Sequence, residues 1–353
     1  MAFLKELENK KDHLKKVDAP KEVKHLDKLI FESDDDYLRL MKETNFENYY
    51  DLIEDFTFKS VIISLSQDEI KLLLEENKRY LENPGDVSTE SLASLSSIEK
   101  KINEGIQEIR QKIKNPLASC FLRLSTRSPK DAIFHMKDFS EVYATKLKEV
   151  NDEFPEDDGG EESIYAKLMA FYLASTEILS ISDGNQGARL LVMSERIQGD
   201  LKLWAERSDP LNLIIREFVK FPVQHELRGF VWKSHLTAIS QYNNIAYLPS
   251  LVQNKKQIEE KVKIFMEKFI KVMSARLENF VVDIVLDYEG NVWIVELNPI
   301  GELTGSCLFS WKSDRKLLLN EEGRFEFRIQ DDPPPMTYIK GELSEQVITY
   351  LKI

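Results

Sequence analysis

The segment that most constrains this chain is FVVDIVLDYEGNVWIVELNPIGE (280–302), which has two apolar, β-branched runs around the dipeptide Glu289-Gly290. Such runs on either side of a glycine-containing turn predict a β-hairpin. If this dipeptide forms the turn, Asp283 faces Glu296 directly across the two strands. The hairpin would therefore hold two carboxylates side by side.

Asn298 lies two residues beyond Glu296 and so projects from the same face. Two facing carboxylates destabilise a sheet by up to about 1 kcal/mol, unless a raised pKa or a bound cation offsets the repulsion. Carboxylate and amide oxygens suit Mg²⁺, which commonly keeps coordination positions open for phosphate oxygens. The sequence therefore predicts an Mg-nucleotide site with Asp283, Glu296 and Asn298 as metal ligands. The alternative is a solvated hairpin with incidental acids, and a bulge would change the register.

Three arginines are embedded in apolar runs that predict strands: Arg123 in CFLRL, Arg216 in LIIREF and Arg228 in LRGF. The planar guanidinium group suits phosphate oxygens, so these side chains would supply the cations that a nucleotide needs. Each arginine taken alone is more often a strand-edge or ion-paired residue. Together with an acidic hairpin, they favour a shared nucleotide site.

Strands and helices alternate along the rest of the chain. Further strand candidates occur at 59–66, 211–219, 227–232 and 236–242, and the 118–134 segment predicts a strand that runs into a turn at Ser128-Pro129. Capping-box patterns predict helices that begin at Ser66 and at Ser96, and amphipathic spacing predicts another over 254–278. The helix after Ser96 has an isoleucine stripe expected to pack on a sheet, formed by Ile98, Ile102, Ile106, Ile109 and Ile113. A largely helical region at 164–206 is interrupted by DGNQG (183–187). This interleaving predicts an α/β or α+β fold.

Composition excludes several classes of protein. The 353 residues carry a formal net charge of −13, which argues against nonspecific binding to nucleic acid or to an anionic membrane. The two cysteines, Cys120 and Cys307, are too few for a disulfide scaffold or a cysteine-built zinc site. We find no glycine-rich nucleotide motif, secretory signal or apolar span, so we expect a cytoplasmic protein.

The hairpin block FVVDIVLDYEGNVWIVELNPIGELTGSCLFSW (280–311) resembles the signature of the cell division cycle protein 123 family. The shared pattern is a strand with Asp, a hairpin, an acid-x-Asn-Pro segment, then Gly-Glu and Leu-Phe-x-Trp. Supporting similarities follow in the family's order at 49–66, 121–134, 213–242 and 325–329. The resemblance covers about residues 46–330, and the hairpin block is its specific part.

The resemblance implies an ATP-grasp fold, in which ATP lies between two α/β subdomains and hairpin acids hold Mg²⁺. We therefore expect three parts. They are a helical N-terminal extension (1–45), an N-terminal ATP-grasp subdomain with a helical insertion (46–210), and a C-terminal subdomain with the metal-binding hairpin (211–345).

Individual positions can be carried over from the family. Asp283, Glu296 and Asn298 would be the metal ligands, with Glu296 at a position where the family more often has Asp. The expected nucleotide contacts are Arg123, Arg216, Glu217, Phe218 and Arg228. Arg123 stands where the family tends to have a phosphate-binding lysine, and Glu217-Phe218 replace a usual Lys-Trp beside the expected adenine contacts.

Two functions of different classes follow. Eukaryotic family members are assembly factors, or chaperones, that bind ATP and the gamma subunit of translation initiation factor 2, without needing to turn over a substrate. Phe309, Trp311 and the 325–345 segment are candidates for such a partner surface. The alternative is an ATP-grasp ligase, in a bacterium or directed at a host, that joins a carboxylate to an amine through an acylphosphate. For that reaction Arg228 and Lys130 are the catalytic candidates, beside Arg127.

Overall fold

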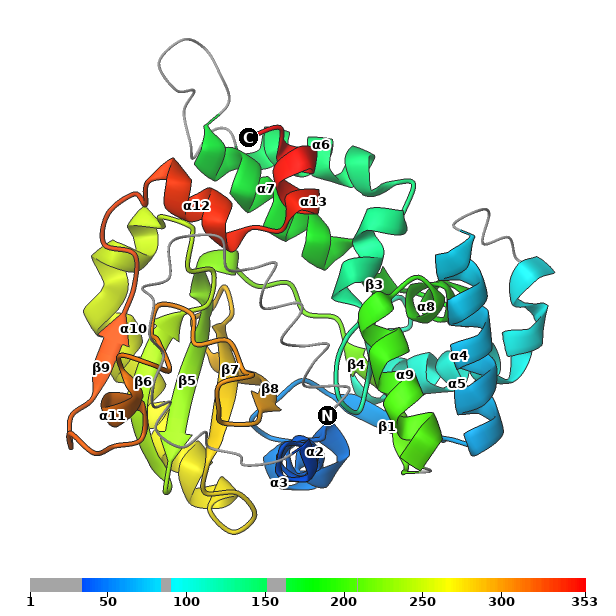
Figure 1. The fold of residues 1–353 in the computed structure, drawn as a ribbon, viewed down its shortest axis with the longest axis horizontal. Helices are drawn as coiled ribbons and strands as arrows, with labels where there is room; N and C mark the ends of the chain where they lie inside the picture. Colours follow the sequence, from blue (N-terminus) through cyan, green and yellow to red (C-terminus); the bar gives the residue numbers. More distant parts are fainter. Residues whose placement is uncertain (1–33, 84–89, 151–162, 208) are drawn as a thin grey trace. The chain divides into compact units, whose positions relative to one another are not determined.

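The computed structural model describes residues 34–83, 90–150, 163–207 and 209–353 (Figure 1). The chain divides into two compact units. The first unit consists of residues 53–223, and the second consists of the residues up to 52 together with 224–353. Each unit contains its own β-sheet. The acidic segment NDEFPEDDGGEES (151–163), which predicts a loop, lies outside the described residues except for Ser163, and so does most of the expected 1–45 extension.

The sheet of the first unit has four antiparallel strands in the order β1-β4-β2-β3. They are β1 (Ser60–Leu65), β2 (Cys120–Leu124), β3 (Ser180–Ile181) and β4 (Leu211–Glu217). The helices of this unit are α4 (Gln67–Glu82), α5 (Ser96–Lys112), α6 (Phe139–Val150), α7 (Ile164–Glu177), α8 (Gly184–Val192) and α9 (Glu195–Arg207). Short 3-10 turns are η2 (Glu90–Leu95) and η3 (Lys130–His135).

Helix α5 covers the apolar face of this sheet. Four members of its predicted isoleucine stripe are buried, namely Ile98, Ile102, Ile106 and Ile109, whereas Ile113 follows the last residue of the helix and is half-buried. The helix also approaches the sheet closely at Gly105. An added Cβ there would lie 2.8 Å from Cγ1 of Ile215 on β4. A larger residue would push the helix away from the strand.

The first predicted capping box is confirmed and the second is wrong. Ser66 Oγ accepts from the Glu69 N–H at 3.2 Å, and the Ser66 N–H donates to Glu69 Oε2 at 2.8 Å. Burial raises the pKa of Glu69, but hydrogen bonds from Lys101, Ser97 and the Ser66 backbone lower it by more, to about 2. Helix α5 begins at Ser96 itself, after Leu95. The Ser97 hydroxyl donates to Glu69 instead, so the second motif serves a contact between helices.

The second unit has a five-stranded sheet in the order β8-β7-β5-β6-β9. Its strands are β5 (Glu226–Trp232), β6 (His235–Gln241), β7 (Phe280–Leu286), β8 (Val292–Asn298) and β9 (Glu326–Arg328). All neighbours are antiparallel except β6 and β9. Its helices are α2 (Asp34–Glu43), α10 (Pro249–Met273), α11 (Arg315–Leu318), α12 (Met336–Glu342) and α13 (Glu345–Leu351). The remaining short elements are η1 (Phe46–Asn48), η4 (Val223–His225) and α3 (Tyr50–Ile53), which ends at the boundary between the units.

The two faces of this sheet are covered differently. Helix α10 packs on one face, where Phe269 meets Phe280 edge-on with ring centroids 6.0 Å apart. It begins five residues before the predicted 254–278 helix and has Pro249 in its first turn. On the other face, sheet residues and the chain after β8 share one apolar cluster: Phe230, Ala238, Val281, Ile300, Phe309, Leu317 and Leu318. This cluster fills only part of that face and leaves room for a polar row.

The compact units divide the chain differently from the expected subdomains. Strand β4 was expected to open the subdomain at 211–345, yet it pairs with β1 on one side and β2 on the other. The boundary therefore falls after Val223. Among the described residues, we find no helix that is both long and apolar enough to cross a lipid bilayer.

Candidate functional site

The β7–β8 hairpin brings the predicted acids together. Asp283 faces Glu296, as predicted. The register changes between the turn and this pair. Leu286 faces Val292 near the turn, and a bulge between Asp283 and the next residue then brings Asp283 opposite Glu296. A two-residue turn at Glu289-Gly290 is therefore wrong. Gly290 has φ +79° and donates its N–H to the Asp287 carbonyl at 3.0 Å, in a longer turn.

Asp287 explains the longer turn. Its carboxylate accepts from the Asn291 N–H at 2.8 Å and from the Trp293 indole N–H at 2.8 Å. Burial raises the pKa of Asp287, but these hydrogen bonds lower it by more. The hydrogen bonds of this side chain hold the longer turn in place. The bulge farther along the hairpin then shifts the pairing by one residue, so that Asp283 still faces Glu296.

Facing residues form one polar row across the whole sheet of the second unit. From β8 to β9 the row consists of Glu296, Asp283, Arg228, Ser240 and Arg328. Directly facing residues share a face, so the five side chains project to the same side.

Arg228 and Asp283 form a buried ion pair at the centre of this row. Arg228 Nε donates to Asp283 Oδ1 at 2.7 Å and Nη2 donates to Oδ2 at 2.8 Å. Only 8% of Arg228 and 1% of Asp283 is exposed. Burial lowers the pKa of the Arg228 guanidinium, but Asp283 raises it by more, so it lies well above its ordinary value. Arg228 therefore keeps its charge in the folded protein.

Three further contacts hold this ion pair. Asn298 Nδ2 donates to Asp283 Oδ2 at 3.2 Å, which confirms that Asn298 shares the face of the acids. Arg228 Nη1 donates to the Gly305 carbonyl at 2.7 Å, and its guanidinium carbon lies 4.9 Å from the ring centroid of Tyr242. Of the predicted metal ligands, Asp283 thus contacts both Asn298 and an arginine that is itself held by other contacts.

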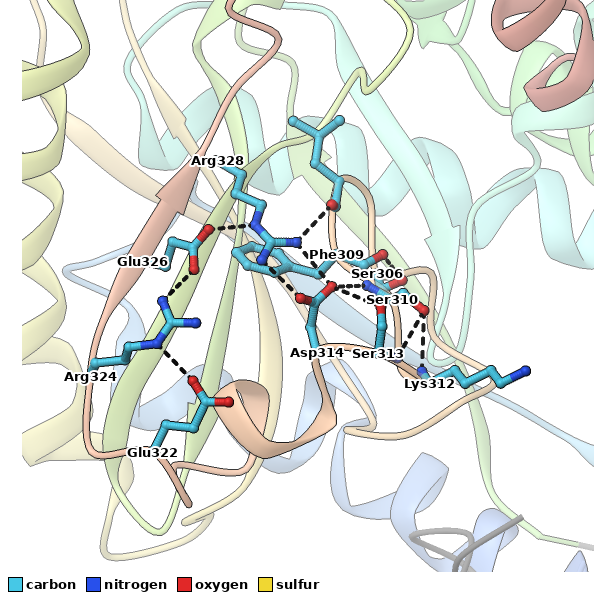
Figure 2. A network of polar contacts seen from close by, with 11 residues as sticks. Ser306, Phe309, Ser310, Lys312, Ser313, Asp314, Glu322, Arg324, Glu326 and Arg328 are labelled. Atoms are coloured by element: carbon cyan, nitrogen blue, oxygen red, sulfur yellow. Dashed lines mark hydrogen bonds and ion pairs between the residues drawn. The ribbon is translucent and has the colours of Figure 1, made fainter. Parts of the chain in front are cut away.

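The loop that follows β8 is tied to the other end of the polar row (Figure 2). Arg328 makes paired hydrogen bonds to Asp314 at 2.8 and 2.9 Å, and its guanidinium lies 4.1 Å from the ring centroid of Phe309. The Leu308 N–H donates to Ser240 Oγ at 3.1 Å. Loop residues 299–314 therefore have fixed anchors on β5, β6 and β9.

This anchoring corrects one sequence expectation. Phe309 is only 5% exposed and packs edge-on against Phe230, with ring centroids 5.6 Å apart. Trp311 is half-buried against the same ring. Phe309 and Trp311 are therefore contacts within the fold, and an exposed partner surface at Phe309 is wrong.

The other two embedded arginines lie in the first unit. Phe121 faces Arg216 and lies two residues from Arg123, so both arginines share the face of the sheet opposite α5. Arg216 donates to Thr57 Oγ1 at 2.7 Å and Ser60 Oγ at 3.3 Å. Both arginines are 3% exposed. The structure thus groups two of the three arginines in one unit.

A turn after β2 holds Arg123 in place. Arg123 donates to the Leu124 carbonyl at 3.1 Å and to the Thr126 carbonyl at 2.9 Å. Asp200 of α9 accepts from Thr126 and from Arg127 Nε, the latter at 2.9 Å. Burial raises the pKa of Asp200, against the lowering effect of Arg127. Sequence reasoning missed Asp200, which lies far from the turn in the chain.

The remaining predicted residues also lie in the first unit. Glu217 is the last residue of β4 and is half-buried. The Phe218 N–H donates to the Ser119 carbonyl at 3.2 Å. Lys130 begins η3 and is exposed. In the part of the chain that the structure describes, we find no group of three or more His, Cys, Asp and Glu that could hold a metal ion. The predicted ligand set has two acids and an amide, so it stays a prediction.

Comparisons with known proteins decide the family. The D123 family model matches residues 170–348, which is half of the chain. The chain belongs to the D123 family. The match includes both strands of the hairpin, the ion pair and the anchored loop, which agrees with the resemblance seen in the sequence.

Two curated relatives illustrate the range of sequence similarity to known proteins. A Xenopus laevis protein named translation initiation factor eIF2 assembly protein is 32% identical over 139 residues, which cover 39% of this chain. The chain spans only 40% of the length of that relative. Cell division cycle protein 123 of Eremothecium gossypii is 24% identical over 317 residues, covering 82% of this chain and 79% of the relative.

The fold is also that of a solved family structure. Cdc123 from Schizosaccharomyces pombe matches with a TM-score of 0.55 at 18% identity, over 82% of this chain and 96% of that chain. The prediction of a mixed α/β, ATP-grasp-like fold is thereby confirmed.

Proposed function

We propose that this protein is an Mg-ATP-binding assembly factor for translation initiation factor eIF2. One observation carries the proposal, namely that D123 family membership joins this chain to relatives named eIF2 assembly proteins. By the resemblance in the hairpin block, the partner would be the gamma subunit of eIF2. If it assembles eIF2, we expect the protein to be located in the cytoplasm.

The hairpin supports the metal part of the proposal. Asp283 and Glu296 face one another on adjacent strands, and the Asn298 amide lies against Asp283. These are the oxygen donors that Mg²⁺ prefers. Asn298 now donates its N–H to Asp283, so its amide would turn to offer oxygen to the cation. A bound Mg²⁺ would neutralise charge on nucleotide phosphates.

The arginines support the nucleotide part. An acidic protein that binds an anion must gather cations locally, and this chain has a net charge of −13. Arg123 and Arg216 lie on one sheet face of the first unit, where carbonyl and hydroxyl partners hold their side chains. Fixed guanidinium groups bind phosphate with little ordering cost. We propose these two arginines as phosphate contacts.

An assembly factor needs ATP only as a ligand. A ligand that binds the folded protein selectively stabilises it, and Mg-ATP would in this way hold the site in one arrangement. Of the two catalytic candidates for a ligase, Arg228 has Asp283 and Gly305 as partners, and Lys130 belongs to the first unit. The contacts described for the site therefore do not favour the ligase over an assembly factor.

The test is capture of the partner with a simultaneous turnover assay. Purified protein is mixed with the recombinant gamma subunit of eIF2 in the presence or absence of ATP and Mg²⁺. We expect a complex that ATP and Mg²⁺ strengthen, with the ATP recovered intact. Lack of any complex would refute the proposed partner. Release of ADP or AMP when an amine-rich extract is added would instead support a ligase.

A further inference from the structure

We propose that Arg228 is a built-in counter-ion that competes with a divalent cation for Asp283. A cation alone would then bind weakly, and it would bind well only together with the phosphates of a nucleotide. The inference rests on the proposed function, because it concerns the same Mg-nucleotide site. It assigns Arg228 a role other than the phosphate contact that the sequence predicts.

The first step is the geometry of the pair. Both nitrogens on one edge of the Arg228 guanidinium bind both oxygens of Asp283, at 2.7 and 2.8 Å. This two-bond arrangement is the strongest that the two groups can form. Asp283, the most buried of the predicted ligands, is therefore already neutralised by a charge belonging to the protein.

The second step is that Arg228 cannot easily leave. It lies on β5, an interior strand between β6 and β7. Its third bonded nitrogen, Nη1, donates to the Gly305 carbonyl, and Tyr242 lies against its guanidinium. Moving the side chain away would break these contacts and leave a buried charge without its partner, which is strongly unfavourable.

The third step follows from charge. A divalent cation bound to Asp283 would lie next to the guanidinium, and like charges repel strongly at sites with little water. Phosphate oxygens would remove this repulsion, because they add negative charge beside both cations. The nucleotide and the metal should therefore bind as partners, with each raising the affinity for the other.

The experiment titrates Mn²⁺ without nucleotide and follows free Mn²⁺ by electron paramagnetic resonance. The wild-type protein should bind weakly at this site. Arg228→Met should bind at least tenfold more tightly, and adding Asp283→Asn to that variant should abolish the gain. Arg228→Lys keeps the charge and should resemble the wild type. Arg324→Met removes a surface arginine of the same unit that also pairs with two carboxylates, so it should change nothing.

Two further results decide the matter. Arg228→Gln is the second neutral variant should Arg228→Met fail to fold, because its amide can still donate to Asp283. If folded neutral variants bind Mn²⁺ no more tightly than the wild type, the inference is overturned. That failure differs from failure of the proposed function, in which the wild type would bind neither ATP together with Mn²⁺ nor the gamma subunit of eIF2.

Discussion

Replacing Asp283 with alanine should destabilise the protein by about 3–5 kcal/mol, because it leaves the Arg228 guanidinium buried without its carboxylate. The loss would be measured by urea unfolding of the wild type and the variant. This effect is independent of any metal or nucleotide. The measurement therefore tests whether Arg228 and Asp283 form a buried, hydrogen-bonded ion pair, as the distances indicate.

A double-variant cycle isolates the pair from general damage. Arg228→Met alone should also be costly, whereas Asp283→Ala combined with Arg228→Met should recover much of the loss, since no buried charge remains. Glu322→Ala is the surface control. It removes a carboxylate partner of Arg324 that is 37% exposed, and it should cost no more than about 1 kcal/mol. A loss of surface size at Asp283 would contradict the buried pair.

Replacing Gly184 with alanine should be the most damaging small change in the first unit. Gly184 begins α8, and its N–H donates to Asn103 Oδ1 at 2.8 Å. A Cβ there would lie 2.1 Å from the backbone carbonyl oxygen of Glu99 on α5, so one helix must move. We expect a loss of about 3 kcal/mol or more, measured by thermal unfolding.

Gly199 provides the matched control. It lies within α9, and an added Cβ would meet no described heavy atom within 4 Å. Gly199→Ala should therefore stabilise the protein by about 0.5–1 kcal/mol through helix propensity. If Gly184→Ala cost no more stability than Gly199→Ala, the close contact between α5 and α8 would be wrong.

Sequence reasoning succeeded where the interacting residues are close in the chain. The isoleucine stripe of α5 follows from helix periodicity. The pairing of Asp283 with Glu296 is also correct, but the turn assumed for it is wrong and the bulge offsets that error. The bulge was missed because it depends on Asp287, whose hydrogen bonds to Asn291 and Trp293 lengthen the turn. Periodicity carries no information about such side-chain preferences within a turn.

Contacts between distant segments could not be predicted. Arg228 and Asp283 are 55 residues apart, and their pairing depends on β5 lying beside β7. DGNQG was predicted to interrupt a helical region. Asp183 in fact caps a new helix, accepting from the Gln186 N–H at 2.9 Å. The predicted break in the helical region is confirmed. That a new helix starts there could not be predicted, because it depends on Gly184 fitting against α5.

The central claim is that the hairpin acids hold an Mg-nucleotide complex. Calorimetry of ATP binding, with and without Mg²⁺, should be done on the wild type and on Glu296→Gln. Glu296 is half-buried and lies outside the Arg228 pair, so the variant should fold. We predict Mg²⁺-dependent ATP binding by the wild type that weakens at least tenfold in Glu296→Gln. ATP binding of equal affinity in both proteins, or ATP binding that ignores Mg²⁺, would contradict the assignment.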